Sequence, residues 1–207
     1  MYEASTTPGE TLTFPALFGW AAALAKSPRR FLRDMAKKGG YGTPILFLAF
    51  WTFASSFISV LVSFVRPSVG GGTMVVRFFG LIASPFLGVL AGFFFAAILF
   101  VIWHLMGSRE DFQTSFRVWS FISPLWAAGS VLGLIPYLSI LVLFAAIYLI
   151  IVASEEVHGL PRDRSLIVWG IICGFFLLLG LLGITLMQFA GNLPPNFRMP
   201  PPGSMVR

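Results

Sequence analysis

Charged residues are scarce in this chain. Asp, Glu, Lys and Arg make up 11% of its 207 residues, whereas a soluble globular domain carries about 25%. Hydrophobic residues reach 57%, and the mean hydropathy is +0.87. This deficit of charge excludes an ordinary soluble domain and indicates a chain whose apolar surface faces lipid.

Cysteine is almost absent as well. The one cysteine, Cys173, lies inside an apolar run, which excludes a disulfide framework and disfavours a reactive thiolate. The N-terminus lacks a basic region followed by an apolar stretch and a small-residue cleavage site. We therefore expect no removable signal peptide and expect the first membrane span to serve as its own insertion signal.

Ionisable side chains are missing from the middle of the long apolar runs, and we expect Arg117, near the end of one run, to snorkel to the interface. Pumps and ion-coupled transporters place acids or histidines near the bilayer midplane, so both classes are disfavoured. A small permease or channel subunit stays open as an alternative, because serine hydroxyls can line a pore, although they more commonly bond helix backbones. The serines concerned are Ser55, Ser56, Ser59, Ser120, Ser123 and Ser130.

What the chain has instead is long charge-free runs. The longest extends between Arg117 and Glu155 for 37 residues, with Pro136 at its middle. A single helix of that length would measure about 56 Å, far more than a hydrocarbon core of about 30 Å. We predict two membrane helices joined by a tight turn at Gly133-Leu134-Ile135-Pro136.

The same reasoning along the whole chain predicts an all-α integral membrane protein with five transmembrane helices. The predicted spans cover about 43–65, 81–106, 112–133, 137–154 and 166–190. They form a membrane domain, residues 43–190, between a cytoplasmic N-terminal segment, residues 1–42, and a Pro-rich external tail, residues 191–207. If the hairpin of the third and fourth segments only dips into the bilayer, three full spans remain.

The distribution of Lys and Arg predicts the orientation. With a cytoplasmic N-terminus, ten of these residues lie inside and four outside, which is the arrangement that the positive-inside rule favours. Either three or five spans then place the C-terminus outside. The inner residues are Lys26, Arg29, Arg30, Arg33, Lys37, Lys38, Arg109, Arg117, Arg162 and Arg164, and the outer ones are Arg66, Arg77, Arg198 and Arg207.

A basic amphipathic helix is predicted over residues 27–38, ahead of the first span. Ser27 and Pro28 suit its N-cap and first turn, and Gly39-Gly40 suits its end. An upstream stretch, residues 14–24, repeats apolar residues near helical spacing, with Trp20 suited to the headgroup zone. Such segments are typical of interfacial helices.

The basic side chains of this predicted helix form a candidate surface for anionic lipid of the cytoplasmic leaflet or for a partner. Ordinary flanking charge without a recognition role is the alternative. Nucleic-acid binding is not expected, because no recognition fold accompanies the charge. The surface consists of Arg29, Arg30, Arg33, Lys37 and Lys38.

One polar cluster, Glu155, Glu156 and His158, follows the fourth predicted span. Paired glutamates followed by an arginine resemble the intramembrane prenyl-protein proteases, but there the arginine follows after three residues, whereas Arg162 follows after five. Gly159 and Pro161 also break a helix, and His104, the other histidine, has no acidic neighbour at helical spacing. We predict a solvated loop without catalytic residues, cofactor or metal, and keep a membrane metallohydrolase as the second alternative.

Small residues at GxxxG spacing predict close helix packing within the spans. A glycine every fourth residue makes a flat helix face that another backbone can approach, either within the bundle or on a second copy of the chain. The predicted packing residues are the pairs Gly88 and Gly92, Gly129 and Gly133, and Gly170 and Gly174.

Several short motifs over residues 26 to 190 resemble the Yip family, the five-span membrane proteins named for interaction with Ypt/Rab GTPases, in its bacterial branch. They are Ser27-Pro28-Arg29-Arg30-Phe31, Gly39-Gly40-Tyr41-Gly42-Thr43-Pro44, Phe112-Gln113-Thr114-Ser115-Phe116-Arg117-Val118, Ser123-Pro124, Gly133-Leu134-Ile135-Pro136 and Glu156-Val157-His158-Gly159-Leu160. The resemblance implies five spans with a cytoplasmic N-terminus, and it supplies no catalytic residue. We predict a non-enzymatic scaffold or adaptor of a bacterial cytoplasmic membrane, acting through anionic lipids and other membrane proteins or a second copy of itself.

Overall fold

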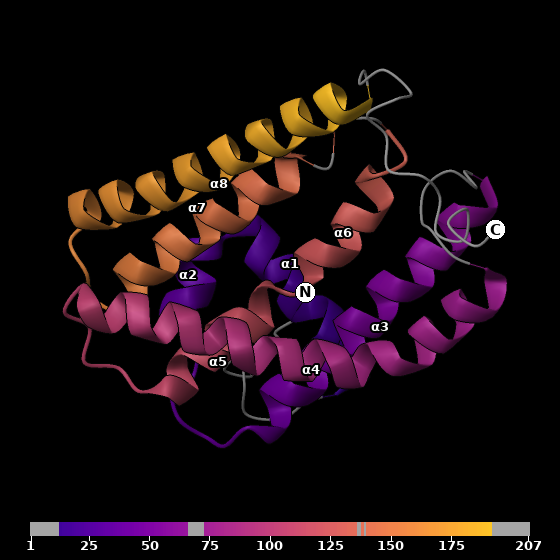
Figure 1. Ribbon diagram of the computed structural model, residues 1–207. Helices are drawn as coiled ribbons and strands as arrows, with labels where there is room; N and C mark the ends of the chain where they lie inside the picture. The colour runs from indigo at the N-terminus through magenta and orange to yellow at the C-terminus, as the bar shows by residue number, and fades with distance from the viewer. Residues whose placement is uncertain (1–12, 66–72, 136–137, 139, 192–207) are drawn as a thin grey trace, which may run out of the picture. The chain divides into compact units, whose positions relative to one another are not determined.

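The computed structural model describes residues 13–65, 73–135, 138 and 140–191, and all regular structure within these ranges is helical (Figure 1). The chain divides into two units, one ending at Leu166 and the other beginning at Ile167. The all-α class is therefore confirmed. Pro136, Tyr137 and the predicted external tail beyond Gly191 lie outside the described residues.

Two short helices precede the first long one. α1 spans Phe14–Lys26 and α2 spans Pro28–Arg33, with Ser27 as the N-cap of α2 and Pro28 in its first turn. The helix predicted over residues 27–38 thus ends five residues early, because residues 34–41 leave the helical path. Trp20, which the sequence suits to the headgroup zone, lies on α1. Its indole is buried and packs edge-on against the ring of Phe121.

α3 (Gly42–Val65) and α4 (Met74–Leu105) are the long helices of the first unit, and they pack against each other. α3 begins and ends close to the predicted bounds, whereas α4 begins seven residues earlier than predicted and includes Arg77. Pro85 lies inside α4 without ending the helix. Large apolar side chains such as Phe86 and Leu105 remain exposed along α4, as lipid-facing positions do.

The third predicted span is divided into two helices, α5 (Phe112–Ile122) and α6 (Pro124–Leu132). The division falls at Ser123-Pro124, because proline lacks the amide hydrogen that would continue the helix. α5 is buried on nearly all sides and packs against α3 and α4, while α6 packs against α3 and α7. α7 spans Ile140–Glu156.

The last helix, α8, spans Arg162–Gly191. Its first residues belong to the first unit and the remainder, from Ile167, to the second. Within the described part of the chain, three helices are long and apolar enough to cross a membrane: Gly42–Phe64, Met74–Leu105 and Arg162–Gly183. α5, α6 and α7 have 11, 9 and 17 residues, so the five-span arrangement remains a proposal.

Candidate functional site

The end of α7 and the side of α2 are joined by ion pairs. Arg29 Nη1 lies 2.8 Å from Glu155 Oε2 and 3.0 Å from Glu156 Oε1, and Arg33 Nε lies 2.8 Å from Glu156 Oε2. The glutamate side chains are only 12% exposed. Residues 29 and 33 share a helix face because they are four positions apart, so one turn of α2 presents two guanidinium groups to consecutive glutamates.

These contacts favour the ionised forms on both sides. The hydrogen bond from Arg33, with that from Arg29, lowers the pKa of Glu156 below its usual range. The hydrogen bonds to Glu155 and Glu156 raise the pKa of Arg29. Glu156, Arg29 and Arg33 therefore stay charged at neutral pH, and their ion pairs hold α2 against α7.

Residues 34–41 are held by two further cations. Lys37 Nζ lies 2.6 Å from Glu110 Oε1 and donates to the carbonyl oxygen of Val157 at 2.7 Å. Arg117, on α5, donates from Nη1 to the carbonyl of Ala36 at 2.8 Å and from Nη2 to that of Gly40 at 3.0 Å. We call the ion pairs of α2 and α7, the Lys37–Glu110 pair and these Arg117 contacts together the charged face.

Arg117 does not snorkel, and that prediction is wrong. Its side chain is fully buried, with 0% of the residue exposed. Gly39 allows this position, because its φ of +128° suits glycine and a Cβ there would lie 3.0 Å from Arg117 Nη2. A buried guanidinium that bonds two backbone carbonyls fixes the path of the chain between α2 and α3.

His158 is also buried, so the prediction of a solvated loop is wrong. Its Nδ1 lies 2.8 Å from Ser108 Oγ, and its ring stacks on Trp103 with a centroid distance of 3.9 Å. Trp103 Nε1 in turn donates to Ser154 Oγ at 2.7 Å. Burial, and secondarily the charge of Lys37, lowers the pKa of His158 to about 3, so the imidazole is neutral at pH 7.

The histidines and acids that the structure describes do not gather into a metal site. Among the residues that the structure describes, no three His, Cys, Asp or Glu side chains converge in a way that could hold a metal ion. Glu155 and Glu156 face arginines, and His104 stacks on Phe100. The charged face makes salt bridges and hydrogen bonds to backbone carbonyls.

The basic surface predicted from the sequence is divided by these contacts. Arg29, Arg33 and Lys37 are engaged by glutamates. Arg30 and Lys38 are exposed, and Arg30 Nε lies 3.6 Å from the Asp34 carboxylate of its own helix. Arg30 and Lys38 can therefore meet a lipid or partner without breaking an ion pair to Glu110, Glu155 or Glu156.

The predicted packing glycines have different surroundings. A Cβ on Gly88 would collide with Thr52, and one on Gly92 with Leu48, so α4 approaches α3 closely at both positions. A Cβ on Gly129 would lie 3.3 Å from Val142 of α7. The nearest atoms to Gly133 belong to its own helix, and Gly170 and Gly174 have no described atom within 4 Å of such a Cβ.

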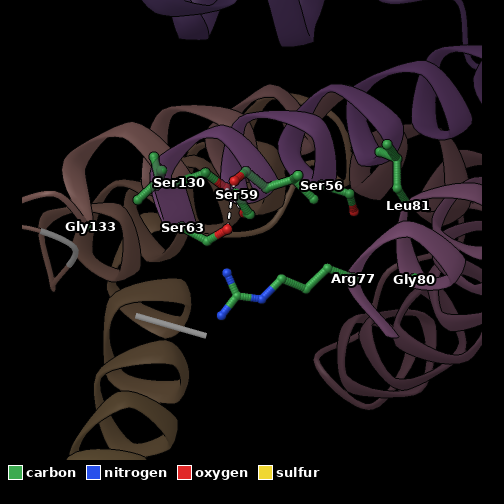
Figure 2. A pocket seen from close by; sticks show the side chains of 11 residues that line it. Ser56, Ser59, Ser63, Arg77, Gly80, Leu81, Ser130 and Gly133 are labelled. Atoms are coloured by element: carbon green, nitrogen blue, oxygen red, sulfur yellow. Dashed lines mark hydrogen bonds between the residues drawn. The ribbon is translucent and has the colours of Figure 1, made fainter. Parts of the chain in front are cut away.

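At the other end of α3 the helices form an open cavity of about 480 Å³, which Figure 2 shows. α3, α4 and α6 line it, and the guanidinium of Arg77 extends into it toward the serines of α3. Ser130 Oγ lies 2.9 Å from Ser55 Oγ and 3.1 Å from Ser59 Oγ. We call this the serine–arginine cavity; its polar lining is Ser56, Ser59, Ser63, Ser130 and Arg77.

The sequence predicts Ser56, Ser59 and Ser130 as pore-lining or packing residues, but it does not predict Ser63 or Arg77 beside them. The spacing of residues 56, 59 and 63 puts their hydroxyls on one helix face, which the sequence alone could have indicated. The sequence predicts Arg77 in the external segment, just before the charge-free run that holds the second span, 81–106. The earlier start of α4 brings it into the bundle.

Three helices that are long and apolar enough to cross a membrane are typical of a helical integral membrane protein. A family model described as the Yip1 domain matches residues 21–185. The chain therefore belongs to the Yip family. A search of the curated proteins and a search of the solved structures found no match to it.

Proposed function

We propose that this protein is a non-enzymatic scaffold or adaptor of a bacterial cytoplasmic membrane, with five spans, a cytoplasmic N-terminus and an external C-terminus. Its charged face would then lie in the cytoplasm. The contacts of this face would hold α2 and residues 34–41 in a fixed position against α5 and α7. The lysine and arginine count, ten inside and four outside, supports this orientation.

Five spans are supported by the way α5 and α6 follow α3. Arg117 of α5 contacts Gly40, next to the start of α3, while Ser130 of α6 contacts Ser55 and Ser59. Ser59 lies 17 residues beyond Gly42, or about 26 Å along the helix. The divided helix pair thus accompanies α3 through most of a hydrocarbon core of about 30 Å.

α7 supports the return crossing. Its first turn meets α6, where a Cβ on Gly129 would contact Val142, and its last turn meets the end of α4, where Trp103 bonds Ser154. Its 17 residues amount to about 26 Å. Together these contacts favour a full hairpin over one that only dips into the bilayer.

The observation that carries the scaffold role is the ion-paired attachment of α2 to α7 across more than 120 residues of sequence. It fixes the pre-span segment, in which Arg30 and Lys38 remain exposed. A fixed surface with exposed cations suits docking to an acidic protein or an anionic leaflet.

In-membrane photo-crosslinking tests this proposal. A crosslinking amino acid at position 30 or 38 should give a discrete protein product or adducts with anionic lipid, whereas one at Phe86, exposed on α4, should give unspecific lipid adducts only. Alkaline phosphatase fused after Arg207 should be active in the periplasm. Identical products from all three positions, combined with solute flux through the purified protein in liposomes, would instead establish the permease or channel subunit.

A further inference from the structure

We propose that the serine–arginine cavity binds the headgroup phosphate of an anionic phospholipid. Its volume of about 480 Å³ falls within the range of about 300–1,000 Å³ that small-molecule sites occupy. The proposal does not depend on the scaffold role, which concerns the opposite end of the molecule.

The chemistry of the cavity suits a phosphate. A guanidinium offers paired N–H donors that match two phosphate oxygens, and the described lining residues contribute one arginine and no carboxylate. The hydroxyls of Ser59 and Ser63 donate to the carbonyl oxygens of Ser55 and Val60. A hydroxyl can rotate to donate to a bound anion instead.

Space for the headgroup is provided by glycine. Gly80, Gly129 and Gly133 line the wall and add no side chain to it, and a Cβ on Gly80 would meet no described atom within 4 Å. The three helices therefore leave room for a headgroup next to Arg77.

The depth of Arg77 matches lipid phosphate. α4 has 32 residues and is about 48 Å long, so it exceeds a hydrocarbon core of about 30 Å by roughly 9 Å at each end if it is centred. Arg77 is the fourth residue of α4 and lies about 5 Å from its start. That level is the headgroup layer.

The helix faces beside the cavity suit acyl chains. Phe78, Phe79 and Ile82 follow Arg77 on α4, and Leu61 and Phe64 flank Ser63 on α3, all with exposed side chains. A phosphate at Arg77 would place its acyl chains along such apolar surface. This favours a phospholipid over free phosphate as the source of the anion.

The test measures lipid retention by the full-length protein in detergent, by native mass spectrometry. Dioleoyl phosphatidylglycerol, dioleoylglycerol, which lacks the phosphate, and inorganic phosphate in large excess are the three probes. Wild type should retain phosphatidylglycerol but not dioleoylglycerol. Arg77→Gln should reduce retention about tenfold, as expected for loss of charge-assisted hydrogen bonds, and Arg77→Lys should reduce it less. Arg109→Gln, the same charge change on an exposed residue after α4, is the matched control and should retain lipid as wild type does.

The proposal would be overturned if wild type and Arg77→Gln retained phosphatidylglycerol equally. It would also be overturned if wild type retained phosphatidylglycerol and dioleoylglycerol equally. Inorganic phosphate that binds in an Arg77-dependent way while phosphatidylglycerol is not retained would overturn the lipid source. If Arg77→Gln does not fold, the wild-type protein is instead crosslinked to a photoactivatable phosphatidylglycerol, and the position of the adducts tests the site. Adducts on residues 56–63, 77–81 or 129–133 support the site, and adducts confined to other peptides contradict it.

Discussion

The two ends of the α3–α4 pair are built in opposite ways. Where α3 begins and α4 finishes, the charged face joins cations to carboxylates and carbonyls from elements distant in sequence. Where α3 finishes and α4 begins, hydroxyls and Arg77 surround open space. The first end has polar groups arranged to hold the chain together, and the second has polar groups arranged around room for another molecule.

The largest expected loss of stability distinguishes Arg117, in the charged face, from Arg77, in the cavity. Arg117→Met should destabilise the protein by about 3 kcal/mol, because it leaves two carbonyls without their donor in a buried site. Arg77→Met should have a smaller effect, since Arg77 borders a cavity. Thermal unfolding in detergent, with limited proteolysis of residues 34–41, measures both. Equal losses would mean that the cavity end is as much a structural core as the charged face.

Low pH should lower the stability of the folded protein, because His158, buried near the charged face, must take up a proton there. Its pKa of about 3 in the folded protein lies below the value of about 6.5 in an unfolded chain, so the unfolded chain binds the proton first. Stability should therefore fall as pH drops from about 6.5 toward 3, with a slope of up to about 1.4 kcal/mol per pH unit.

The matched variant for this pH effect is His158→Gln, which should be less stable at pH 7 but much less sensitive between pH 6.5 and 4.5. Glu156, whose pKa is lowered by Arg33 and Arg29, loses its contribution only as pH falls below about 4.3. The upper window therefore isolates the histidine. An unchanged slope in His158→Gln would show that another group titrates there.

A charge exchange should test the ion pairs between α2 and α7. Arg33→Glu and Glu156→Arg should each lower the melting temperature, by less than Arg117→Met does, because Arg33 is largely solvent-exposed. The double variant should recover part of the loss, since the pair reforms with reversed sign. Arg30→Glu, an exposed neighbour whose nearest acid is Asp34, is the control and should change little. Additive losses in the double variant would exclude direct pairing.

The long apolar helices could be predicted because hydropathy and length are local properties. The predicted spans 43–65 and 166–190 fall close to α3 and α8. Proline alone does not predict the break at Ser123-Pro124, because Pro85 lies inside α4 without ending it. The predicted start of the second span was late because Arg77 was taken as a boundary. A single arginine near a helix end does not end a span when it can reach polar groups.

The charged face could be predicted only in part. Arg29 and Arg33 are four positions apart, and the consecutive Glu155 and Glu156 carry the opposite charge, so the sequence indicates that the two pairs could meet. The burial of Arg117 was not readable, because its partners are backbone carbonyls of residues 36 and 40. Every residue has a backbone carbonyl, so a sequence does not indicate which carbonyls an arginine will contact. Gly39-Gly40 is compatible with a close approach by Arg117, but it is equally compatible with a helix end.

The smallest expected effect compares one hydroxyl from each end. Ser130→Ala removes the contacts with Ser55 and Ser59 and should destabilise by about 0.6 kcal/mol, the average for side-chain hydrogen bonds between membrane helices. Ser154→Ala should cause a larger loss, about 1–2 kcal/mol, because Ser154 is fully buried and accepts the Trp103 indole N–H. Unfolding of both variants under identical detergent conditions measures the difference. If Ser130→Ala is the more damaging, the hydroxyls of the cavity hold the bundle together, and the contrast between a closed end and an open end fails.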